Sequence, residues 1–109
     1  MSTECRVGVL NQGGTVLSIA VDSDGFPSYM LQRALKTYDT REKALKLVDG
    51  GDLSFLDLYR GDRTRQAAPD RGQPRLSTTH RNVGEYIRYS DCSYYYLFTD
   101  EGRWEAVGP

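Results

Sequence analysis

Arginine and tyrosine are the side chains with the most binding chemistry in this sequence, and both gather in its second half. Five arginines lie between residues 60 and 75: Arg60, Arg63, Arg65, Arg71 and Arg75. Asp62 and Asp70 lie among them, so this segment sums to +3 in a chain whose net charge is -1. Guanidinium groups bind carboxylates and phosphates through paired N–H donors. We therefore predict that the segment contacts a partner; the alternative is a solvated loop whose arginines pair with nearby aspartates.

The tyrosines that follow suggest a second contact surface. Strand alternation places Tyr95 on the opposite face from Tyr94 and Tyr96. Whichever face the helices leave uncovered then displays tyrosine to water. Tyrosine and tryptophan are enriched at the energetic centres of protein interfaces. We predict that Tyr94, Tyr95 and Trp104 bind a partner together with the arginines; the alternative is a set of tyrosines that only stiffens the sheet.

No residue pattern indicates catalysis, a metal or a cofactor. His80 is the single histidine and lies beside Ser77, Thr78 and Thr79 without a carboxylate in a triad-like arrangement, so we expect an exposed loop histidine. The Asp-Ser-Asp-Gly sequence at 22–25 lacks the further oxygen ligands of a calcium loop. The Gly-Gly pairs have no Lys-Ser or Lys-Thr after them, so no phosphate-binding loop is predicted.

The two cysteines and the apolar pattern predict a cytosolic chain. Cys5 and Cys92 each fall in or near an expected strand, where they could pair. No leader-like segment and no apolar run of membrane-spanning length occurs, so we expect reduced, half-buried thiols and no membrane contact. The length of 109 residues fits one domain, residues 1–109.

The first half of the sequence predicts a hairpin followed by two helices. Residues 4–21 alternate apolar and polar around Gly13 and Gly14, as an antiparallel hairpin does. Residues 22–27 favour a turn, and an apolar stripe predicts a helix over 27–38. A second helix is expected from Asp39, as the cap, to Gly50-Gly51.

The second half is less regular until its end. Residues 52–59 are compatible with either a helical turn or a short strand, and residues 60–77 with an exposed loop. Residues 79–89 suggest a short helix whose buried side carries Val83, Tyr86 and Ile87. Residues 93–107 predict a second hairpin that turns at 99–102. The sum is an α+β fold: an antiparallel sheet built from an N-terminal and a C-terminal hairpin, with the helical pair packed on one face.

Three short motifs resemble a family of small, mostly uncharacterised bacteriophage and prophage proteins. They are the Asp24-Gly25-Phe26-Pro27 turn, the Gly51-Asp52-Leu53-Ser54 stretch after the helical pair, and Tyr96-Leu97-Phe98 ahead of Trp104. The resemblance covers residues 5–56 and 94–105 and brings no catalytic residues with it. It implies a phage setting, in the cytoplasm of a host bacterium, where such proteins are often inhibitors of host machinery, including anti-CRISPR proteins.

The leading hypothesis is therefore a non-enzymatic binding protein. It would inhibit a host protein complex by protein–protein contact, plausibly a CRISPR effector or another defence component, with or without bound nucleic acid. Direct nucleic-acid binding by the basic segment at 60–75 is an alternative that predicts steep salt dependence. A small phage enzyme of unknown chemistry is another, and exposed sheet edges also allow a homodimer.

Overall fold

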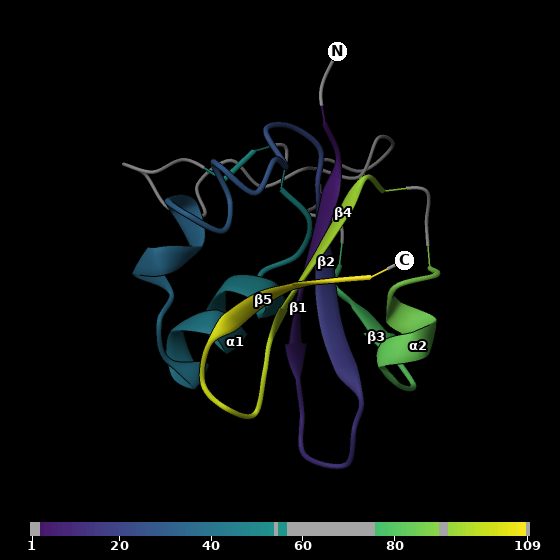
Figure 1. Ribbon diagram of the computed structural model, residues 1–109. Coiled ribbons are helices and arrows are strands. Elements are labelled where there is room, and N and C mark those ends of the chain that lie inside the picture. Colours follow the sequence, from purple (N-terminus) through teal and green to yellow (C-terminus); the bar gives the residue numbers. More distant parts are fainter. Residues whose placement is uncertain (1–2, 54, 57–75, 90–91, 109) are drawn as a thin grey trace.

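A single five-stranded sheet with helical segments on both faces forms the body of the protein (Figure 1). The computed structural model describes residues 3–53, 55–56, 76–89 and 92–108. Its elements, in chain order, are β1 (Cys5–Leu10), β2 (Val16–Val21), the 3-10 helix η1 (Ala34–Thr37), α1 (Arg41–Asp49), β3 (Thr78–His80), α2 (Val83–Tyr86), β4 (Tyr94–Phe98) and β5 (Trp104–Val107).

The strands lie in the order β3-β2-β1-β4-β5. The predicted α+β class is confirmed, and both expected hairpins, β1–β2 and β4–β5, lie in one sheet. The sheet is mixed rather than wholly antiparallel, because β1 and β4 run parallel where the two hairpins meet. Cys5 lies opposite Tyr94 there, and the backbone N–H of Ser93 donates to the carbonyl of Glu4 at 3.1 Å. This contact aligns the starts of the two strands.

One face of the sheet carries the larger core. Alternate residues of β1, β2 and β4 project there: Cys5, Val7, Val9, Ile19, Val21, Tyr96 and Phe98. They pack against residues of the 27–37 segment and of α1: Met30, Leu35, Ala44, Leu47 and Val48. The opposite face carries a smaller core in which Val16, Tyr95 and Leu97 pack with Tyr86 of α2. Both faces of the central strands are therefore covered, and the expectation of an uncovered tyrosine face is wrong for Tyr95, which is 1% exposed.

The predicted helical pair packs on one face of the sheet, but only its second member is a regular α-helix. Residues 27–37 coil irregularly: the N–H groups of Ala34 and Leu35 reach back five residues, and the coil ends in η1. Its apolar stripe nevertheless packs into the larger core. Helix α1 is capped by Thr40, whose Oγ1 accepts from the Lys43 N–H, and not by Asp39. Asp39 pairs with the Lys43 ammonium at 3.3 Å instead.

The region before β4 differs from the predicted helix over 79–89. Its first residues form the edge strand β3, and α2 begins only after Asn82. Asn82 caps the helix by accepting from the Glu85 N–H at 2.9 Å, and the Glu85 carboxylate accepts from the Arg81 N–H at 3.3 Å. This reciprocal capping fixes the start of the helix, so the Thr-Thr-His sequence before it is left to pair with β2.

The connector after α1 contains one strand-like contact. Leu53 forms an isolated parallel bridge with Val21, and the Asp52 carboxylate accepts from the Ala20 N–H at 2.8 Å. The remainder of the 52–59 prediction from Asp57 onward lies outside the described residues, as does most of the loop predicted at 60–77.

Candidate functional site

Three polar side chains from three neighbouring strands meet on the α2 face of the sheet. Arg6 comes from β1, Ser18 from β2 and His80 from β3. Their exposed fractions are 5%, 0% and 3%, so the cluster is built into the protein and not displayed on it. The Arg6 guanidinium reaches Ser18 Oγ through Nε at 3.1 Å and through Nη2 at 3.0 Å. Ser18 Oγ and His80 Nε2 are 2.6 Å apart.

The two hydrogen bonds from Arg6 determine which group donates in the hydrogen bond between Ser18 and His80. A serine hydroxyl has one donor hydrogen and two acceptor lone pairs. Arg6 has only donors and occupies both lone pairs of Ser18, so the Ser18 O–H donates to His80 Nε2. His80 therefore accepts at Nε2 and carries its proton on Nδ1. The arrangement requires the neutral imidazole.

The electrostatics agree with a neutral imidazole. Burial lowers the pKa of His80, and the positive charge of Arg6 lowers it further, while Glu85 opposes this shift. The expectation of an exposed loop histidine is thus wrong. Nothing in the local sequence reveals this burial, because a three-residue strand has too little alternation to be recognised.

Two tyrosine rings enclose the cluster. Tyr86 lies 5.1 Å from the His80 ring, and Tyr89 lies 4.8 Å from it, edge to face. The Tyr89 ring also covers the Arg6 guanidinium at 4.7 Å, a cation–π contact. Tyr86 is fully buried and lies over Gly8, where an added Cβ would come within 3.0 Å of the ring. Its hydroxyl donates to the Tyr96 carbonyl at 2.7 Å.

The cluster has the parts of a nucleophile and a base but lacks access. A serine hydroxyl within hydrogen-bond reach of a neutral imidazole is the arrangement that activates serine nucleophiles. Ser18, however, has no exposed surface, and neither of the two surface pockets described below includes it. What the cluster offers from outside is the Arg6 charge beneath Tyr89, a ring that is 52% exposed.

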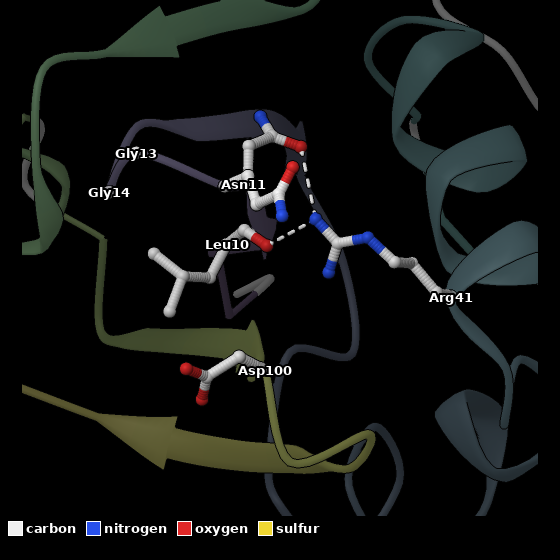
Figure 2. A pocket seen from close by; sticks show the side chains of 7 residues that line it. Leu10, Asn11, Gly13, Gly14, Arg41 and Asp100 are labelled. Atoms are coloured by element: carbon white, nitrogen blue, oxygen red, sulfur yellow. Dashed lines mark hydrogen bonds between the residues drawn. The ribbon is translucent and has the colours of Figure 1, made fainter.

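The first surface pocket lies at the β1–β2 turn (Figure 2). It has a volume of about 490 Å³ and is lined by Leu10, Asn11, Gln12, Gly13, Gly14, Arg41 and Asp100. Arg41 points from the start of α1 to the Leu10 carbonyl at 2.6 Å and to Asn11 Oδ1 at 3.5 Å, so it ties the helix to the turn. Its opposite wall is the Asp100 carboxylate, so the pocket has no dominant charge.

The second pocket contains Trp104, one of the predicted binding residues. It has a volume of about 270 Å³, with an apolar floor from Leu31, Leu35, Phe98 and Trp104 and a charged rim from Lys36, Asp39 and Arg103. The Trp104 indole N–H donates to the Tyr38 carbonyl at 2.8 Å, and its ring lies edge to face on Phe98 at 5.2 Å. Trp104 is therefore half-buried and fixed in orientation.

The other predicted tyrosine lies at the end of the sheet. Tyr94 is half-buried, stacks on Tyr96 at 6.4 Å and contacts Phe26, which is 46% exposed, at 6.4 Å. We call Phe26 and Tyr94 the aromatic end. The five arginines at 60–75 lie outside the described residues. Of their described flanks, Leu56 comes three residues after Leu53, which is bridged to Val21 at the end of β2, and Leu76 comes two residues before β3, so both lie near this same end of the sheet.

Cysteine and metal chemistry give no alternative site in the described part of the chain. Cys5 and Cys92 are not joined by a disulfide; Cys5 is buried and Cys92 half-buried. Burial raises the pKa of the Cys5 thiol, so it stays protonated and unreactive. Among residues 3–53, 55–56, 76–89 and 92–108, no three His, Cys, Asp or Glu side chains come together to hold a metal ion. Nor does any described helix have the length and apolarity to cross a membrane.

Comparison with protein families, with curated proteins and with solved structures found no match.

Proposed function

We propose that this chain is a non-enzymatic binding protein that inhibits a protein complex of a bacterial host by protein–protein contact. The observation that carries the proposal is the distribution of side chains. The groups with nucleophile and base chemistry, Ser18 and His80, are sealed in the protein, whereas Phe26, Tyr94 and Trp104 are partly exposed and held by neighbouring rings or backbone. Rigid, half-exposed aromatics bury much area on binding at little entropic cost.

The arginine-rich segment supports the same proposal. Its described flanks, Leu56 and Leu76, lie near the aromatic end formed by Phe26 and Tyr94. Aromatic residues and arginine together are the residue types most enriched at interface centres. A partner with carboxylates, or with phosphates of a bound nucleic acid, would complement them.

The resemblance to small phage and prophage proteins supplies the setting. In that setting the partner is a host defence complex, plausibly a CRISPR effector, and the protein acts in the bacterial cytoplasm. A homodimer is compatible with this mode of action, because β3 and β5 are the edge strands of the sheet and an edge strand can pair with a second chain.

The test is capture of a host complex by the tagged chain, followed by a plaque or interference assay for the defence system recovered. Phe26→Ser is the variant for the aromatic end, and Glu42→Ser, an exposed residue of α1 beside Arg41 near the β1–β2 turn, is its control. We expect Phe26→Ser, and a charge reversal of Arg63 and Arg65, to weaken capture and inhibition together while leaving the fold intact. Equal capture by all variants would show that this surface does not bind.

Nucleic-acid binding through the basic segment is the second candidate, favoured by its local charge of +3. It predicts an affinity for oligonucleotides that falls steeply with salt, because counterions are released on binding. Binding that does not change with salt, or no binding, excludes it.

A further inference from the structure

Arg6 is a buried cation with no carboxylate beside it in the described part of the chain. The ion pairs described there involve Lys43, Arg81 and Arg103, each at the surface. The side-chain partners of Arg6 among the described residues are the neutral Ser18 hydroxyl and the Tyr89 ring. Burying a charge without a counterion is costly, so natural proteins normally supply one.

The hydrogen bonds of Arg6 leave one defined edge of its guanidinium available. Nε and Nη2 both donate to the same Ser18 oxygen. The Nη2 hydrogen in this bond is therefore the one on the same side of the guanidinium as the Nε hydrogen. The second Nη2 hydrogen and the Nη1 hydrogens remain, and they point away from Ser18 at the far end of the group. Nη1 has no hydrogen-bond partner within the described residues.

Nη1 of Arg6 keeps some contact with solvent. In the described residues, no side-chain nitrogen or oxygen is both sealed from water and without a partner. Nη1 has no hydrogen-bond partner among those residues, so it is not sealed from water, although Arg6 as a whole is only 5% exposed. The side chain is thus a largely desolvated cation whose Nη1 end meets solvent.

Among the described residues, no charged group neutralises that edge. His80 is held as a neutral acceptor, and Tyr86 and Tyr89 contribute rings. Glu85 is the charged group nearest to His80 on α2, and its carboxylate is engaged by the N–H and the guanidinium of Arg81. The local field therefore favours an anion.

We propose that Arg6 binds an oxyanion, of the phosphate or carboxylate class, through its Nη1 and Nη2 edge beside the Tyr89 ring. Two parallel N–H donors match two oxygens of either group. A phosphate carries the larger charge and is the stronger ligand of the two. This site is separate from the aromatic end and from the Trp104 pocket, and its test does not depend on the proposed function.

The test is a titration of the full chain with sodium phosphate at constant ionic strength, set with sodium chloride, followed by NMR. The Arg6 Nε–Hε signal and the Tyr89 ring signals are the readouts. We expect saturable shifts of both, and their loss in Arg6→Gln but not in Arg88→Gln, an exposed arginine just after α2. A parallel titration with sodium acetate distinguishes a phosphate ligand from a carboxylate ligand. If acetate saturates the site at a lower concentration than phosphate does, the site is assigned to a carboxylate. Shifts that rise linearly and equally with chloride overturn the proposal.

A second readout separates binding from a purely structural role of Arg6. Because Arg6 lowers the pKa of His80, an anion on Arg6 must raise it, by thermodynamic reciprocity. We expect phosphate to shift the His80 titration midpoint upward and Arg88→Gln to leave that shift unchanged. No shift of the midpoint at saturating phosphate contradicts the proposal.

Two further variants keep the result decisive. If Arg6→Gln does not fold, Arg6→Lys keeps the charge without the paired donors, and we expect phosphate binding about tenfold weaker or more. Asp91 lies two residues after Tyr89 in the sequence and outside the described residues. If Asp91→Asn binds phosphate and the natural chain does not, the counterion of Arg6 is the Asp91 carboxylate of the chain itself, and the proposal is overturned.

Discussion

Lowering the pH from neutral should destabilise this protein through a single side chain, His80. The folded state holds its imidazole neutral, because Nε2 must accept from Ser18 and because burial and Arg6 lower its pKa below the ordinary value of 6.5. The unfolded chain therefore binds a proton that the folded chain does not. Stability is fully present above the unfolded pKa and is lost as the pH falls through 6.5 toward the folded pKa.

The magnitude is bounded by the uptake of one proton. One proton bound on unfolding gives a slope of at most about 1.4 kcal/mol per pH unit. Between about pH 6.5 and 5, where ordinary carboxyls titrate little, the loss is then at most about 2 kcal/mol. Protonation also turns Nε2 from an acceptor into a donor, which faces the cationic Arg6 across Ser18. Opening of the cluster beside Tyr89 is the expected local response.

Urea unfolding at several pH values, on the natural chain and on His80→Gln, measures the slope directly. We expect the natural chain to lose stability over this interval and the variant to lose much less. The chain has a single histidine, so its NMR titration in an untagged sample needs no assignment by mutation. A native-state midpoint at or above 6.5, or equal slopes for the two proteins, would refute the reasoning.

Three further substitutions test contacts that stabilise the fold, each by urea or thermal unfolding. Gly8→Ala places a Cβ 2.8 Å from Val16 and 3.0 Å from Tyr86, and we expect a loss of about 1–3 kcal/mol; a neutral change would mean that Tyr86 does not lie on β1. Tyr86→Phe removes the hydroxyl that donates to the Tyr96 carbonyl and should cost about 1 kcal/mol, against no change if that hydroxyl is solvated. Thr40→Ala removes the cap of α1 and should also cost about 1 kcal/mol, with Thr40→Ser retaining the stability; an equal loss in both would place the cap elsewhere.

The local sequence accounts for the hairpins and for α1. Alternation in residues 5–10 selects an extended strand with one mainly apolar face, and the aromatic run at 94–98 selects another strand. Gly13 and Gly14 supply the positive φ, 91° and 93°, that the first turn requires. The apolar stripe of α1 likewise anticipates which of its sides is buried. The hairpins and α1 depend on residues a few positions apart in the chain, which is why the local sequence pattern predicts them.

The candidate site was completed by the tertiary structure. Arg6 and Ser18 are 12 residues apart on the two strands of the predicted hairpin, whereas His80 is 62 residues from Ser18 and no local pattern links it to them. His80 joins them because β3 pairs with β2. Pairing between distant strands depends on which faces can be buried together, a property of the whole chain. The same rule turned Tyr95 inward, under α2, although its strand was correctly predicted.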